Sequence, residues 1–227
     1  MKKKIYFEYL YLVVLGILSS LSLPPYNFLF INFATFSLFF IYIFHKKKSS
    51  SRNNKFLYGW FFGFGYFLSN LYWISNSLKF DKNFENLIIL SILLIPFLLA
   101  LFYGLFSYLL KFFNIKMNFS SILIFSLSLS IVEYLRGTIL GGFPWNLITF
   151  SLVNIISSLQ ILSFIGTYSL NLLVITFYTL PIIIFFNIKN LRKYTILLLA
   201  ALILSINIYY GLNKIEKTKN KPKKIIS

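Results

Sequence analysis

The sequence predicts an all-α fold, a polytopic bundle of about seven transmembrane helices. Of its 227 residues, 58% are hydrophobic and only 12% are charged, whereas about a quarter of a soluble domain is charged. The mean hydropathy of +0.78 indicates too little polar surface to cover a water-soluble globule. The apolar residues also fall in long uncharged runs, the pattern of bilayer spans. We therefore expect one transmembrane helical domain, residues 1–212, followed by a polar, lysine-rich tail, residues 213–227.

Seven apolar runs predict the spans, and each run ends at a polar or helix-breaking segment. The runs cover residues 5–23, 28–44, 56–78, 87–110, 119–135, 166–186 and 194–210. A basic start before an apolar run also occurs in signal peptides. No small-x-small cleavage site precedes Pro24, however, and more spans follow, so we interpret the first run as a retained helix. Pro24 and Pro25 end it because proline lacks an amide donor, and Pro96 is a tolerated kink in the fourth run.

The apolar segment from 146 to 187 is too long for one span. We assign 166–186 as the sixth span, and we expect 147–165 to lie shallow or partly inserted because it carries four polar side chains. These are Asn154, Ser157, Ser158 and Gln160. The alternative is that this segment crosses twice, which gives eight spans.

The basic residues predict the orientation of the bundle. With a cytoplasmic N-terminus, the outer loops before the tail hold only Lys79, Lys82 and Arg136. The inner loops hold Lys2, Lys3, Lys4, Lys46, Lys47, Lys48, Arg52, Lys55, Lys111, Lys116, Lys189, Arg192 and Lys193. This excess follows the positive-inside rule and puts the C-terminus outside after seven spans. The tail is itself rich in lysine, so charge alone does not decide between seven and eight spans.

The charge and the cysteine count restrict the chemistry. The net charge is +17, but the basic residues sit in short loops between apolar runs, which favours membrane orientation over nucleic-acid binding. The sequence has no cysteine, so it offers no disulfide, thiolate nucleophile or cysteine metal site. The single histidine, His45, cannot form a metal cluster and is interpreted as an interfacial residue. We expect no metal and no cofactor. Glu8, near the basic end of the first span, can reach the interface or pair with a lysine.

The third span carries small and polar residues at helical spacing on one face, namely Gly59, Gly63, Tyr66, Asn70 and Trp73. The two glycines form a small-xxx-small pair, which predicts close approach of another helix. Asn70 is expected to face the bundle or a wet cavity rather than lipid.

Candidate substrate-binding residues gather at the outer end of the fifth span. Glu133 and Arg136 are three residues apart, a spacing that allows a pair on one helix face. An acid beside a span is a functional candidate, and a local ion pair at the interface is the equal alternative. A permissive glycine, a rigid proline and a large ring follow in Gly142, Phe143, Pro144 and Trp145.

These residues resemble a known family. The segment 133–137 followed by 142–145 is similar to the signature of apolipoprotein N-acyltransferases. Three other segments agree in the same order, at 23–26, 59–73 and 166–171. The resemblance covers nearly the whole chain.

The resemblance implies an acyltransferase of the bacterial inner membrane that acts in lipoprotein maturation. Members transfer an acyl chain from a phospholipid to the N-terminal amine of a diacylglyceryl-cysteine lipoprotein. Their helical bundle leads into a nitrilase-like domain on the outer side, where a Glu-Lys-Cys triad forms a thioester. The implied partners are the phospholipid acyl donor, the diacylglyceryl lipoprotein acceptor, membrane lipid and a separate nitrilase-like half, with no nucleic acid.

The sequence departs from the family where that domain is expected to begin. The resemblance favours seven spans and implies that residues 213–227 are a basic extracytoplasmic linker with the truncated start of that domain. Residues 223–227 resemble its lead-in, and no triad can be placed because there is no cysteine. We therefore expect the N-terminal membrane part of a truncated, split or incomplete member that is inactive alone. The alternative is a non-enzymatic lipid-binding or assembly protein. A small transporter fits less well because the sequence shows no internal repeat and few mid-span charges.

Overall fold

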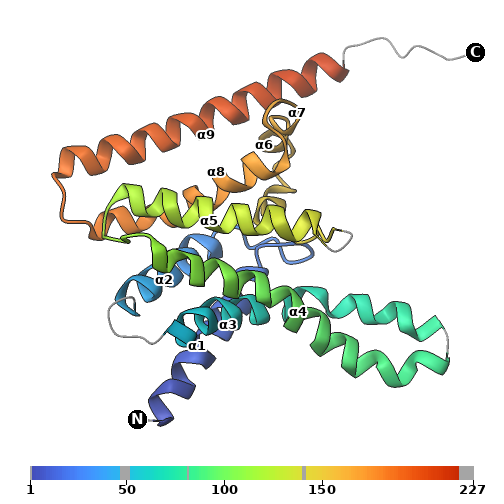
Figure 1. The fold of residues 1–227 in the computed structure, drawn as a ribbon. Helices are drawn as coiled ribbons and strands as arrows, with labels where there is room; N and C mark the ends of the chain where they lie inside the picture. Colours follow the sequence, from blue (N-terminus) through green and yellow to red (C-terminus); the bar gives the residue numbers. More distant parts are fainter. Residues whose placement is uncertain (1, 47–51, 81, 140–141, 220–227) are drawn as a thin grey trace, which may run out of the picture.

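The computed structural model describes residues 2–46, 52–80, 82–139 and 142–219, and these residues form helices and turns without a strand. The predicted all-α fold is confirmed (Figure 1). Prediction and structure differ in where several helices end.

The first half of the chain packs three helices and a long hairpin together. Its elements are α1 (Lys2–Ser20), α2 (Ile31–Lys46), α3 (Arg52–Leu71), the 3₁₀ helices η1 (Tyr72–Phe80) and η2 (Lys82–Leu87), and α4 (Ile88–Leu109). Figure 1 shows η1, η2 and the start of α4 projecting from the bundle as an arm.

The second half places α5 and α8 at the centre and α9 at the edge (Figure 1). Its elements are η3 (Leu110–Phe112), α5 (Phe119–Thr138), η4 (Ile148–Leu152), α6 (Ile156–Leu159), α7 (Leu162–Ile165), α8 (Thr167–Thr179), η5 (Leu180–Phe185) and α9 (Asn190–Lys219).

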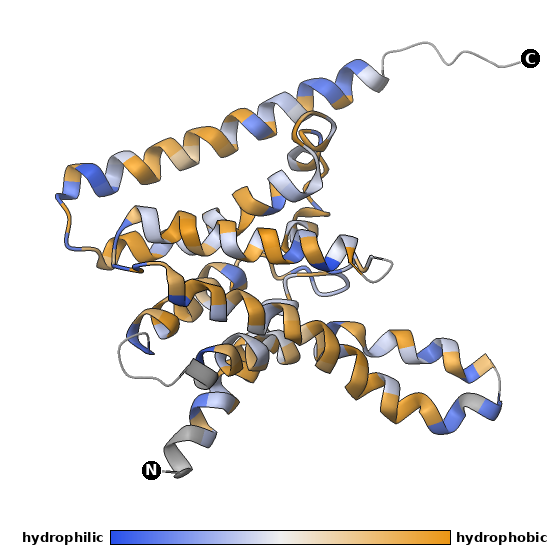
Figure 2. Ribbon diagram, viewed as in Figure 1, coloured by the Kyte–Doolittle hydropathy of each residue, from blue (hydrophilic) through white to orange (hydrophobic). Residues whose placement is uncertain are grey.

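Within the part of the chain that the structure describes, four helical segments are long and apolar enough to cross a membrane, residues 85–112, 119–138, 167–185 and 190–218. They correspond to the predicted fourth to seventh spans. Figure 2 shows the hydrophobic colouring along α4 and α9, with hydrophilic residues gathered near their ends. The first two predicted spans are shorter apolar helices. A helical membrane bundle is therefore confirmed, and the count of seven spans stays a prediction.

The segment 147–165 forms separate short helices, η4, α6 and α7, rather than one continuous span. This agrees with the prediction that the segment is not a full span. Its depth in the membrane stays a prediction. At the other end of the chain, α9 runs on to Lys219, beyond the expected end of the last span at 210. A helix can continue past the apolar run into water because its backbone hydrogen bonds are internal.

The core is built from aromatic rings. Phe39 of α2 stacks on Phe62 of α3 with ring centroids 4.1 Å apart. Phe125 of α5 meets Phe39 and Phe106 of α4 edge to face. All four rings are buried, and such offset and edge-to-face pairs are the favoured geometries for aromatic rings. Together they join α2, α3, α4 and α5 at one point.

The small-xxx-small pair of α3 packs against α4, as predicted. A Cβ atom added at Gly59 would overlap the Tyr103 carbonyl, and one added at Gly63 would overlap the Tyr103 ring. The Gly59 amide also donates to Ser107 Oγ at 3.0 Å. Backbone proximity of this kind is what small residues allow between membrane helices.

Glu8 pairs with a lysine, which confirms one of the two roles expected for it. Lys46 Nζ donates to Glu8 Oε1 at 2.5 Å, and Tyr42 Oη donates to Glu8 Oε2 at 3.3 Å. These bonds join the start of α1 to the end of α2, so both helix ends lie on the same side of the bundle.

Candidate functional site

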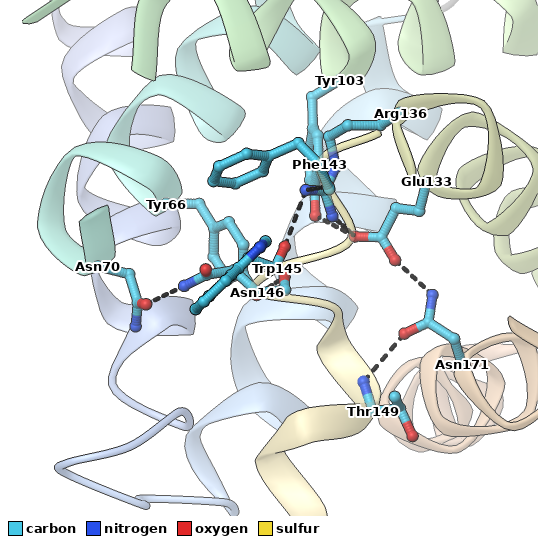
Figure 3. A network of polar contacts seen from close by, with 10 residues as sticks. All are labelled: Tyr66, Asn70, Tyr103, Glu133, Arg136, Phe143, Trp145, Asn146, Thr149 and Asn171. Atoms are coloured by element: carbon cyan, nitrogen blue, oxygen red, sulfur yellow. Dashed lines mark hydrogen bonds and ion pairs between the residues drawn. The ribbon is translucent and has the colours of Figure 1, made fainter. Parts of the chain in front are cut away.

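Glu133 lies at the centre of a buried polar network. Its side chain in α5 has no exposed surface. Tyr103 Oη of α4 donates to Glu133 Oε1 at 2.7 Å, and Asn171 Nδ2 of α8 donates to Glu133 Oε2. Figure 3 shows the carboxylate between these two donors. One acid therefore connects three helices inside the bundle.

The network continues through Asn171. Its Oδ1 accepts a hydrogen bond from the Thr149 backbone amide at 2.9 Å, which attaches η4 to α8. Neither Tyr103 nor Asn171 was singled out from the sequence as a partner of Glu133. An amide within an apolar span is the one signal that could have marked Asn171, because such groups in a membrane usually have a partner.

Arg136 pairs with Glu133 across one helical turn, as the three-residue spacing predicted. Its Nη2 lies 3.9 Å from Glu133 Oε1, and both side chains are fully buried. The guanidinium carbon also lies 5.2 Å from the centroid of the Phe67 ring, within the range of a cation–π contact. The charge is thus compensated inside the protein.

Arg136 also holds the turn that follows α5. Its Nη1 donates to the backbone carbonyls of Phe143 at 2.7 Å and Trp145 at 2.8 Å (Figure 3). The Phe143 amide donates back to the Arg136 carbonyl at 3.0 Å. Gly142 has a φ of +78°, a left-handed conformation that glycine adopts without strain. Leu140 and Gly141 lie outside the described residues.

Arg136 therefore lies inside α5 rather than in an outer loop, where the charge count placed it. The helix continues to Thr138, three residues past its predicted end at Leu135. Inside the helix, Nη1 is hydrogen-bonded to two carbonyls and Nη2 faces the Glu133 carboxylate at 3.9 Å, whereas Nε and Nη2 have no hydrogen-bond partner. Removing it from the outer loops strengthens the contrast in basic residues on which the orientation depends.

A cleft of about 570 Å³ opens beside the turn. The rings of Trp145, which is 56% exposed, and Trp73 lie on it with centroids 5.8 Å apart. Asn146 Nδ2 donates to Asn70 Oδ1, and Tyr66 Oη donates to the Asn146 carbonyl at 2.8 Å. Asn70 thus faces a cavity within the bundle, as predicted. Pro144 lines the same cleft.

The six candidate residues therefore divide into two groups. Glu133 and Arg136 are buried behind the turn and support it. The turn itself is formed by the other four residues, Gly142, Phe143, Pro144 and Trp145. The cleft joins aromatic faces to paired amides, a combination suited to a molecule with an apolar and a polar part. Across the described residues, no group of three His, Cys, Asp or Glu side chains is placed to hold a metal.

Comparison with known proteins gives one consistent family. Residues 15–180 match the Apolipoprotein N-acyltransferase N-terminal domain. The chain is 33% identical over 182 residues to the apolipoprotein N-acyltransferase of Rhodopseudomonas palustris, covering 78% of this chain and 34% of that protein. It is 37% identical over 207 residues to the enzyme of the same name from Rickettsia typhi, covering 89% of this chain and 40% of that protein. The chain thus spans well under half the length of these relatives.

Proposed function

This chain belongs to the apolipoprotein N-acyltransferase family, whose N-terminal domain matches residues 15–180, and we propose that it is the membrane part of such an enzyme. In this proposal a phospholipid donates an acyl chain to the N-terminal amine of a diacylglyceryl-cysteine lipoprotein. The name that the relatives share supports an acyl transfer to apolipoproteins. The resemblance of the segment 133–145 to the family signature supports the same substrates.

We further propose that the chain lies in the bacterial inner membrane with a cytoplasmic N-terminus and a periplasmic C-terminus. The positive-inside rule supports this orientation. The ion pair between Glu8 and Lys46 supports it as well, because it brings the basic ends of α1 and α2 to one side.

The observation that carries the proposal is the cleft between Trp73 and Trp145. Tryptophan combines a large apolar ring with one polar N–H and is favoured where a membrane meets water. The amides of Asn70 and Asn146 lie on the same cleft, and they offer donors and acceptors to a lipid headgroup or ester. We assign this cleft to the entry of the phospholipid acyl donor.

The remaining candidates act from behind the cleft. A guanidinium group such as that of Arg136 is well suited to hold a lipid phosphate. Its Nη1 is bonded to the Phe143 and Trp145 carbonyls, and its side chain is fully buried. Direct contact with a phosphate would require the guanidinium to leave its buried position. We therefore propose that Arg136, with Glu133, fixes the position of Trp145.

The acyl transfer itself needs groups from outside these 227 residues. The family's thioester step requires a cysteine thiolate, and the sequence contains none. We propose that a nitrilase-like part with the Glu-Lys-Cys triad works together with this bundle on its outer side. Its triad would act on the lipid that the cleft presents.

The test is reconstitution in vesicles with phospholipid and a diacylglyceryl peptide, read by the mass of the peptide. The 227-residue chain alone is expected to leave the peptide amine free, and adding a nitrilase-like half from a relative should restore transfer. Steady acylation by the chain alone would contradict the proposed division of roles. Failure of the mixture, despite binding of the two parts, would favour a non-enzymatic lipid-binding protein.

A further inference from the structure

Helix α9 is fixed to the rest of the bundle near its two ends. Near one end Lys193 Nζ donates to the Ile184 carbonyl of η5 at 3.0 Å. Toward the other end Asn207 Nδ2 donates to the Ser158 carbonyl at 3.1 Å, and a Cβ atom added at Gly211 would overlap the Ser157 carbonyl. Figure 1 shows α9 running apart from α8 between these attachments.

A groove of about 390 Å³ separates the two helices. Apart from Asn207, its walls are apolar side chains over about two turns of each helix, a length of about 10 Å. The residues of α8 are Leu170, Leu173, Val174 and Phe177, and those of α9 include Ile203, Leu204, Ile206 and Tyr210. Both helices are long and apolar enough to span the membrane. With both helices in the membrane, the apolar walls of the groove would face lipid acyl chains.

The polar rim of the groove carries a positive charge. Lys214 lies one turn beyond Tyr210, with Nζ 5.9 Å from the centroid of the Tyr210 ring. Its Nζ donates to the Gln160 carbonyl at 3.2 Å and to Ser163 Oγ. An ammonium group has three donors, so one remains for an anion. Tyrosine followed by lysine is also the order expected where a span reaches the headgroup region.

We propose that this groove holds one acyl chain of an anionic glycerophospholipid, with its phosphate beside Lys214. The apolar walls match the chain, and the charge of Lys214 matches the phosphate one to two turns above them. The lipid would fill the space between α8 and α9 and hold α9 against the bundle. The site has its own lining residues, separate from the cleft at Trp73 and Trp145, and it does not depend on the proposed acyl transfer.

Native mass spectrometry of the purified full chain in detergent tests this site. The probes are phosphatidylglycerol and phosphatidylcholine with the same acyl chains. We expect one phosphatidylglycerol to stay bound per chain, about fivefold more tightly than phosphatidylcholine, because one lysine contributes about that factor at an anionic headgroup. Lys214→Gln should retain a lipid but lose most of the preference.

Filling the groove should remove the lipid. Leu173→Trp from α8 and Ile206→Trp from α9 both place a large ring in it, and Ile206 is 58% exposed, so its variant keeps the fold. The matched control is Leu202→Trp, at a half-exposed position of α9 outside the groove, which should retain the lipid. Equal lipid retention by all three tryptophan variants would overturn the site. An unchanged headgroup preference in Lys214→Gln would also overturn the site. A lipid-free dimer that Ile206→Trp converts to monomers would do the same, because a second copy of the chain would then occupy the groove.

Discussion

The Asn171 amide donates to the Glu133 carboxylate, 38 residues away in the chain, and both side chains are fully buried. Through this bond α8 holds the acid of α5, and the acid lies beside the arginine that fixes the Trp145 turn. The position of the exposed tryptophan thus depends on residues that are buried behind the turn. Substitutions at Glu133 and Arg136 test these contacts.

Glu133→Gln should destabilise the bundle. Glutamine keeps the shape of the side chain but leaves the buried Arg136 charge without its partner, a loss of roughly 3–5 kcal/mol for a buried pair. Thermal unfolding in detergent measures the effect. The matched control is Glu85→Gln, because Glu85 is exposed in η2, and it should leave the unfolding midpoint unchanged. Equal midpoints for both variants would mean that the pair contributes little to stability.

Arg136→Lys should weaken phospholipid use although the positive charge remains. A lysine has no planar fork that can hold two carbonyls while facing a carboxylate, so the turn loses its support. A displacement of about 1 Å at a reacting site can lower the rate by about 10²-fold. Kinetics in the reconstituted system measure this effect, with the exposed Arg192→Lys as control. Unchanged kinetics at normal protein levels would favour an ion pair with only a local structural role.

Trp145→Ala should raise the KM for phospholipid about tenfold and change kcat less, because the ring contributes binding surface rather than reacting atoms. Trp60→Ala is the matched control. Trp60 lies in α3, where it stacks on Phe64 and donates to the Phe97 carbonyl, away from the cleft. If both variants raise KM equally, the cleft has no special place in lipid binding.

The topology predicts where fused reporters are active. The loops 46–55 and 189–193 should face the cytoplasm, and a reporter fused after Asn213 should be active only if it functions outside the cytoplasm. Lys46 and Glu8 are paired, so a label at either residue should report the same side. Cytoplasmic activity of the fusion after Asn213 would mean six or eight spans.

Local features of the site could be predicted from the sequence, because they depend on spacing within one helix. The ion pair of Glu133 and Arg136 and the close packing at Gly59 and Gly63 are of this kind. The fold class also followed from composition and run length. The contact between Tyr103 and Glu133, by contrast, joins residues 30 apart on different helices. Periodicity does not say which faces of two helices meet.

The burial of Arg136 was missed for a related reason. A hydropathy analysis assigns a charged residue to a loop. It does not show that the carbonyls of Phe143 and Trp145, seven and nine residues later, accept hydrogen bonds from Arg136. The end of α5 was therefore placed too early. A charged residue just past an apolar run can extend the helix when later residues supply its hydrogen bonds.

The most direct test of the central claim is to find which residues the phospholipid touches. Vesicles containing the chain and a phospholipid with a diazirine beside its headgroup would be irradiated, and the labelled residues mapped by mass spectrometry. We predict labels on the segments that carry Trp73 and Trp145, and their loss when unlabelled phospholipid competes. Labels confined to the outer faces of other helices, with none in this cleft, would contradict the account.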